Sequence, residues 1–190
     1  MRLTSRQLCS RFAPRNGRQS NVLIVGAERW DEFTDAGLLG DGSHRVIVAN
    51  PRETVAARRF VTEGGTFIQS TIERLRSRLG PFDLICENYP YTVARVKGVC
   101  HEKPCPIWLS KREVRAYARA RLKHLAPNGR WILFTESPGF ACALRSIGRT
   151  DETIRRNFNI RVVRLTNQEA PPSSYPRMAT RFKLIFQRRP

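Results

Sequence analysis

Long apolar runs are missing from this sequence, and so are several patterns that would assign it to common protein classes. No stretch approaches the ~18 apolar residues that a membrane-spanning helix requires. The first twenty residues hold no apolar segment of the kind found in a secretory signal. The pattern G-x-G-x-x-G is also absent, which disfavours a nucleotide-dependent oxidoreductase. Because the sequence has neither a membrane-spanning segment nor a secretory signal, we expect no membrane partner.

Paired cysteines are missing too. The five cysteines are scattered and odd in number, so they predict no disulfide framework and favour a reducing compartment, here the cytoplasm. Cys100-His101 and Cys105 lie close together, but without a C-x-x-C pair we expect ordinary thiols rather than a metal site. Residues 1–20 are rich in arginine and serine and lack acids, which predicts a flexible basic arm and also permits an organellar presequence.

Acidic residues are scarce. The chain of 190 residues has 16 acidic and 34 basic residues, a net charge of +18, and 29 of the basic residues are arginine. Arginine binds phosphate in bidentate geometry and stacks on bases, so this excess predicts a polyanionic partner, above all a nucleic acid. A solvated arginine-rich surface is the alternative. The chain is 41% apolar and 26% charged, which is typical of a globular domain, and we place one domain at 21–190.

Seven apolar segments alternate with helical patterns. Consecutive apolar residues indicate strands covered on both faces, as in parallel sheets. The predicted strands are 21–25, 45–49, 66–69, 82–86, 130–136, 160–165 and 181–186. Helical spacing is present at 54–61, 70–79 and 110–125, with Ser110 as an N-cap, and Asp151 can cap a further helix.

The last two strands are joined by a Pro-rich segment that cannot be a crossover helix, so they should pair antiparallel. The pattern as a whole predicts an α/β fold: a Rossmann-like, seven-stranded, mostly parallel sheet with helices on both faces and a C-terminal antiparallel hairpin.

Three segments carry a resemblance to a known family: "NVLIVGAE", "HLAPNGRWILFTES" and "FDLICENYPY". In this order of strands they resemble the glycine loop, the fifth strand and the catalytic loop of class I S-adenosylmethionine-dependent methyltransferases. Asn88-Tyr89-Pro90-Tyr91 fits Asn-x-Pro-Tyr, which is similar to the motif of enzymes that methylate planar amino nitrogens of nucleic acids or protein glutamine. The resemblance covers about residues 21–187 and implies S-adenosylmethionine as cofactor.

The chemistry explains such a motif. An amino nitrogen conjugated with a ring or carbonyl is a poor nucleophile, and the carbonyl oxygens of Asn88 and of the backbone near Tyr89 can accept its hydrogens and orient its lone pair. Pro90 stiffens the loop, and Tyr91 can stack on a planar base or amide. An ordinary turn after a buried strand is the alternative interpretation.

The resemblance also implies a cofactor site, on residues that depart from the family pattern. The positions concerned are Gly26, Ala27, Glu28, Asn50, Ser70 and Asn88. Glu28 stands where the family usually has a second glycine. Asn50 stands where the family has an acid that hydrogen-bonds to the ribose hydroxyls. Ser70 or Gln69 stands where the family commonly has an Asp that contacts the adenine amino group. The alternative is a methyltransferase-like fold that binds no cofactor and serves to contact RNA or protein.

Candidate substrate residues follow the motif. They are Tyr89, Tyr91, Lys97, Trp108, Arg112, Arg115 and Arg119, the three arginines lying on one stripe of the helix at 110–125. We predict an N-methyltransferase acting on a nucleic acid, with RNA favoured. The alternatives are methylation of a protein amide or small molecule, and a non-catalytic RNA- or ribonucleoprotein-binding module. The sequence does not decide the oligomeric state, a protein partner, or whether the chain is part of a longer protein such as a toxin.

Overall fold

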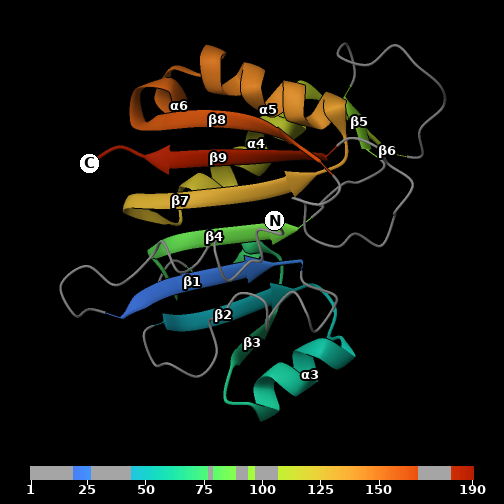
Figure 1. Ribbon diagram of the computed structural model, residues 1–190, viewed down its shortest axis with the longest axis vertical. Coiled ribbons are helices and arrows are strands. Elements are labelled where there is room, and N and C mark those ends of the chain that lie inside the picture. Colours follow the sequence, from blue (N-terminus) through green and yellow to red (C-terminus); the bar gives the residue numbers. More distant parts are fainter. Residues whose placement is uncertain (1–18, 27–43, 77–78, 89–93, 97–106, 167–180) are drawn as a thin grey trace.

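The computed structural model describes residues 19–26, 44–76, 79–88, 94–96, 107–166 and 181–190 (Figure 1). These residues form a seven-stranded sheet with the order β3-β2-β1-β4-β7-β9-β8 and a separate two-stranded sheet of β5 and β6. The strands of the large sheet are β1 (Ser20–Val25), β2 (His44–Asn50), β3 (Thr66–Gln69), β4 (Phe82–Asn88), β7 (Leu125–Thr135), β8 (Phe158–Leu165) and β9 (Arg181–Arg188).

The sheet is parallel from β3 to β7, and β9 pairs antiparallel with both β7 and β8. The buried runs of β1, β2 and β4 carry side chains into cores on both faces, as the continuous apolar segments predicted. The predicted Rossmann-like sheet and its C-terminal hairpin are therefore confirmed.

Helices cover both faces of the sheet. One face packs against α3 (Val55–Thr62), mainly through Phe60. The other face packs against α4 (Lys111–Leu122), α5 (Pro138–Thr150) and α6 (Glu152–Asn157), which gather beside β7, β9 and β8 in Figure 1. Among the described residues, no helix combines the length and apolar character needed to span a membrane.

Most predicted helix starts are confirmed. Thr54 caps α3, and Ser110 and Glu113 form a reciprocal capping box at the start of α4. Asp151 caps α6 by accepting the backbone N–H of Ile154 at 3.2 Å.

The prediction of a helix over 70–79 is wrong. Ile72–Arg74 forms a short 3₁₀ turn (η3), and Leu75 returns to extended backbone, so no α-helix runs through the described residues of this segment. The spacing of Ile72 and Leu75 by three residues fits this tighter turn, in which residues i and i+3 lie on one face. Both side chains are buried, so the apolar pattern is satisfied without an α-helix.

Three elements were not anticipated. Helix α5 begins at Ser137-Pro138, with Ser137 as N-cap and Pro138 at the first helical position. The short strands β5 (Ala94–Val96) and β6 (Ile107–Leu109) pair in parallel in a part of the chain for which no strand was predicted.

Candidate functional site

The carboxyl ends of four neighbouring strands bring the candidate residues into one row. Gln69 pairs with Asn50 between β3 and β2, and Asn88 pairs with Phe134 between β4 and β7. Val25 of β1 pairs with Ala49 on one side and Glu87 on the other, so Gly26 follows in register between Asn50 and Asn88. With strands about 4.8 Å apart, Asn50 and Asn88 lie about 10 Å from each other across Gly26. This is where the strand order reverses, the place at which open α/β sheets bind ligands.

Gly26 follows β1 with a backbone conformation that favours glycine. Its φ is 76°, and its N–H donates to the carbonyl of Ala49 at 3.3 Å. A side chain at this position would be strained. The following residues, Ala27 and Glu28, lie outside the described residues.

The loop after β3 is tied to the end of β2. The N–H of Ser70 donates to the carbonyl of Asn50 at 2.8 Å, and the Ser70 hydroxyl donates to the carbonyl of Thr71 at 3.1 Å. Asn50 is 3% exposed, and a neutral amide is compatible with that burial where a carboxylate would need a charged partner. Glu53, three residues after Asn50, pairs with Arg58 at 3.2 Å.

These three positions fit an adenosyl group in the chemistry that they offer. Gly26 keeps the backbone open, Asn50 presents an amide that can both donate and accept, and Ser70 holds the third loop against β2. All three lie at consecutive strand ends of one sheet edge.

Asn88 is the last residue of β4, but its side chain is not among those described. Tyr89, Pro90, Tyr91 and Lys97 lie outside the described residues. The backbone of Trp108 belongs to β6, and its side chain is likewise not described. The roles of these residues therefore stay predictions.

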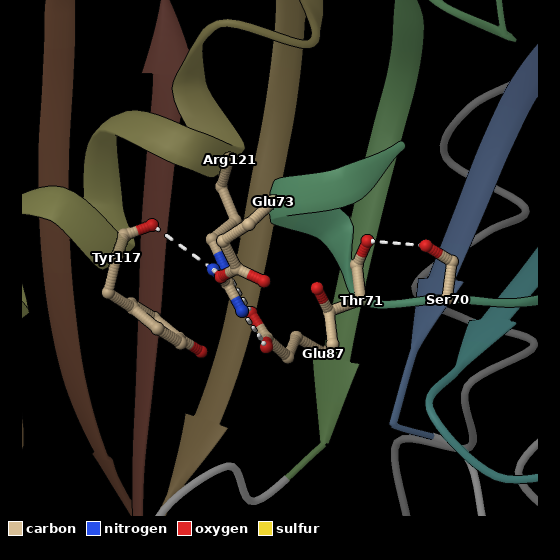
Figure 2. A network of polar contacts seen from close by, with 6 residues as sticks. All are labelled: Ser70, Thr71, Glu73, Glu87, Tyr117 and Arg121. Atoms are coloured by element: carbon tan, nitrogen blue, oxygen red, sulfur yellow. Dashed lines mark hydrogen bonds and ion pairs between the residues drawn. The ribbon is translucent and has the colours of Figure 1, made fainter. Parts of the chain in front are cut away.

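Directly behind the end of β4 lies a buried ion-pair network (Figure 2). Arg121 of α4 donates to both carboxylate oxygens of Glu87, at 2.9 and 3.1 Å, and to the carboxylate of Glu73 in η3. Its guanidinium also lies 3.5 Å from the ring centroid of Tyr117 and donates to that residue's carbonyl at 3.3 Å. The side chains of Arg121 and Glu87 are 5% and 3% exposed.

This network joins two parts of the candidate site. Glu87 immediately precedes Asn88, and Glu73 lies three residues after Ser70 in the adenine-side loop. Burial opposes the charge of Arg121, but the carboxylate of Glu87 more than offsets it, so the pKa of Arg121 is raised. Burial would raise the pKa of the Glu73 carboxyl, but the charge of Arg121 and hydrogen bonds to the carboxylate outweigh it, so that pKa is lowered. Arg121 and Glu73 therefore stay charged at neutral pH, and the network fixes the end of β4 against η3.

A second buried pair follows the end of β7. Arg181 donates to Glu136 at 3.1 Å, and the two side chains are 8% and 0% exposed. The other carboxylate oxygen of Glu136 has no hydrogen-bond partner among the described residues. This places a carboxylate one strand away from Asn88 at the same edge of the sheet.

Two arginines of the predicted stripe on α4 form ion pairs within the protein. Arg119 and Arg115 both contact Asp151, at 2.8 and 3.5 Å. Burial would raise the pKa of Asp151, but the N–H of Ile154 and the two arginines lower it below its ordinary value of 3.8. Arg112 is exposed and contacts no acid within the described part of the chain.

Sequence reasoning missed Glu87, Arg121 and Glu136, although two of them left a signal. Glu87 is a charged residue at the end of a buried strand, which requires a partner. Arg121 lies seven residues after Val114 and three after Ala118, on the apolar stripe of α4 rather than opposite it. No group of three or more metal-ligating side chains occurs in the described ranges, and Cys100, His101 and Cys105 lie outside them.

Comparison with known proteins gives structural matches. No protein-family model and no curated protein matches the sequence. A Listeria monocytogenes protein assigned to the class I S-adenosylmethionine-dependent methyltransferases matches with a TM-score of 0.61 and 13% identity, over 94% of this chain and 56% of that one.

Two further matches cover more of the solved chain. A Burkholderia thailandensis 1,6-didemethyltoxoflavin-N1-methyltransferase, solved with S-adenosylhomocysteine, has a TM-score of 0.58 and 16% identity, over 98% of this chain and 78% of that one. An rRNA methylase from Streptococcus thermophilus has a TM-score of 0.53 and 11% identity, over 90% and 89%. At these identities the likeness shows the fold, and the chain has the fold of class I S-adenosylmethionine-dependent methyltransferases.

Proposed function

We propose that this protein is an S-adenosylmethionine-dependent N-methyltransferase that acts on an amino nitrogen of RNA. One observation carries the proposal: Gly26, with its positive φ, lies in register between Asn50 and Asn88 at the switch point of a methyltransferase fold. Three features that the cofactor and the reaction need therefore meet at one edge of the sheet. They are an open turn, a ribose-side amide and the start of Asn-x-Pro-Tyr.

The residues of the chain would divide the work between binding and orientation. Gly26, Ala27 and Glu28 would border the cofactor's methionine portion, Asn50 its ribose and Ser70 its adenine. When bound, S-adenosylmethionine supplies an electrophilic methyl group. Asn88 and the carbonyls near Tyr89 and Pro90 would accept the hydrogens of the acceptor NH₂, which aims its lone pair and favours pyramidalisation. Tyr91 would stack on the planar group that carries the nitrogen.

The ion-pair network supports this division by fixing where β4 ends. A carbonyl oxygen helps an approaching NH₂ only if its position is set before the reaction. Arg121 holds Glu87, the residue before Asn88, through two hydrogen bonds in a buried environment. The backbone that presents Asn88 is therefore anchored one residue away, at Glu87.

Nucleic acid is the favoured acceptor because of charge. The net charge of +18 favours a polyanion, and one matched solved structure is an rRNA methylase. The neighbours also include a methyltransferase of a small molecule, so the fold by itself does not choose the acceptor. Lys97, Trp108 and Arg112 remain candidate substrate contacts within this proposal.

The test separates cofactor binding from methyl transfer. Isothermal titration with S-adenosylmethionine comes first, followed by transfer of a tritiated methyl group to RNA, DNA and protein extracts. Asn88→Ala should abolish transfer and leave cofactor affinity within about tenfold, or about 1.4 kcal/mol. Asn157→Ala, an exposed amide at the end of α6, is the matched control and should transfer at the wild-type rate. Full activity of Asn88→Ala would remove Asn88 from the mechanism.

A second candidate is a non-catalytic RNA-binding module. It is favoured by the absence of an acid at the buried end of β2, where Asn50 binds a ribose hydroxyl less strongly than a carboxylate would. This candidate predicts no heat on titration with millimolar S-adenosylmethionine, together with retained RNA binding.

A further inference from the structure

A groove of about 590 Å³ lies on the α5 side of the edge strand β8, away from the candidate active site. We call it the α5–β8 groove. Its described walls come from α5, α6, β8 and β9. Six arginines line it, namely Arg145, Arg149, Arg155, Arg161, Arg164 and Arg189. None of the described residues that line it is acidic.

The acids of the described chain are engaged elsewhere. Seven of them pair with arginines outside the groove, and Asp83 and Glu113 accept the backbone N–H groups of Asn21 and Ser110. The seven are Glu53, Glu63, Glu73, Glu87, Glu136, Asp151 and Glu152. The excess positive charge of the described chain is thereby left at surfaces such as the groove, where Arg145, Arg149 and Arg161 are exposed.

The floor of the groove is apolar and closely packed. Ile160, Val162 and Phe182 contribute partly buried side chains. Gly148 allows β8 to approach α5, because a Cβ at this position would lie 1.9 Å from Cδ1 of Ile160. Partly exposed apolar and aromatic surface between cations is what a single-stranded nucleic acid needs for its bases, while the arginines suit its phosphates.

The groove leads toward the candidate active site. Strand β8 has eight residues, about 26 Å of extended chain, and runs parallel to β7 because both pair antiparallel with β9. Arg164 and Phe182 pair with each other at its carboxyl end. Three strand spacings, about 14 Å, separate this end from Asn88. A few nucleotides of an extended strand can bridge that span.

We propose that the α5–β8 groove binds the phosphate backbone of single-stranded RNA and leads it to the carboxyl edge of the sheet. The choice of RNA as the polyanion rests on the proposed function, but the groove itself is defined by its own charge and shape. A duplex is a poorer occupant, since its bases are stacked internally and cannot use the apolar floor.

The experiment measures RNA affinity without any cofactor. Fluorescence anisotropy with a labelled single-stranded RNA compares the wild-type protein with the triple variant Arg145→Gln/Arg149→Gln/Arg161→Gln. Each phosphate contact with a single strand contributes about fourfold to affinity at about 150 mM salt, so three lost contacts predict about 50-fold weaker binding. The slope of log affinity against log salt should become shallower by about 2.

A matched control removes three charges from outside the groove. Arg45, Arg76 and Lys123 are exposed, and none of them lines the groove. Their triple substitution by Gln should weaken RNA binding by less than about threefold, apart from any long-range term. Equal losses in the two triple variants would mean that net charge alone binds RNA and would overturn the proposal. Tighter binding of a duplex than of the single strand would also overturn it.

Two further measurements distinguish failure of the groove proposal from failure of the proposed function. Crosslinking of 4-thiouridine RNA followed by mass spectrometry should label peptides of 145–164 or 181–189, and labels confined to other segments would contradict the groove. Titration of the groove variant with S-adenosylmethionine should match the wild type, because these arginines lie away from Gly26 and Asn50. A protein that binds RNA through the groove but takes no cofactor would refute the proposed function and leave the groove intact.

Discussion

Replacing Arg121 by methionine should sharply destabilise the protein. The change leaves Glu87 buried, 3% exposed, without the two hydrogen bonds at 2.9 and 3.1 Å that now neutralise it. Removing one partner of a buried ion pair typically costs about 3–5 kcal/mol. The whole domain is expected to be stable by about 5–15 kcal/mol, so this one substitution removes a large share of the free energy of unfolding.

The measurement is urea unfolding followed by circular dichroism. With a dependence of about 2–3 kcal/mol per molar urea, the loss shifts the midpoint downward by about 1–2 M. Arg112→Met is the matched control, on the same helix but exposed and without an acidic contact in the described chain, and it should change stability by less than about 0.5 kcal/mol.

A double variant tests the reason for the loss. Glu87→Leu with Arg121→Met removes both buried charges and fills the space with apolar atoms, which is often close to neutral in stability. We expect it to recover most of the loss seen in Arg121→Met. If the single variant unfolds with the midpoint of Arg112→Met, or if the double variant is worse than the single, the argument from an unpaired buried charge is refuted.

Two other substitutions test the scaffold. Asp151→Asn keeps an oxygen for the Ile154 N–H but removes the charge that faces Arg119. Because the folded pKa of Asp151 lies below 3.8, its ionised form stabilises the fold above that pH, and this contribution is lost as pH falls through the folded value. The stability gap between wild type and Asp151→Asn should therefore close in acid, and a gap independent of pH would contradict the assignment. Gly129→Ala places a Cβ 2.8 Å from the carbonyl oxygens of Ala126 and Phe82. This crowding should lower the free energy of unfolding by about 1–3 kcal/mol, measured by thermal unfolding. Unchanged stability would show that the turn can accommodate the extra methyl group.

The sheet was predictable because its signals are local. Continuous apolar runs, the breaker Gly80-Pro81 and a Pro-rich final connection determine which segments are strands and how the last two pair. The missed helix α5 also had a local signal, Ser137 followed by Pro138 at its start. The prediction of a helix at 70–79 was wrong because apolar spacing alone does not distinguish helix types. The separation of three residues between Ile72 and Leu75 suits a 3₁₀ turn as well as an α-helix.

The partners of charged residues were not predictable from spacing, because they are set by contacts between distant elements. Arg115 and Arg119 belong to a regular basic stripe, yet Asp151 reaches them from the start of α6. Arg121 had a position on the apolar stripe that predicts burial, but nothing local identifies Glu87, 34 residues earlier, as its partner. The α5–β8 groove likewise combines helix and strand residues that are separated in the sequence.

Arginine serves two physically different purposes in this fold. Arg121 and Arg181 are buried and paired, so salt screens them little, and they hold the carboxyl end of β4 and the amino end of β9 in place. Arg145 and Arg149 are exposed, and no acid lines the described part of their groove, so a polyanion that binds them displaces only water and counterions. Because the acids of the described chain are engaged outside the groove, the second arrangement remains positive. Arginine can therefore both stabilise the candidate site, through buried ion pairs, and attract its substrate, through the positive groove.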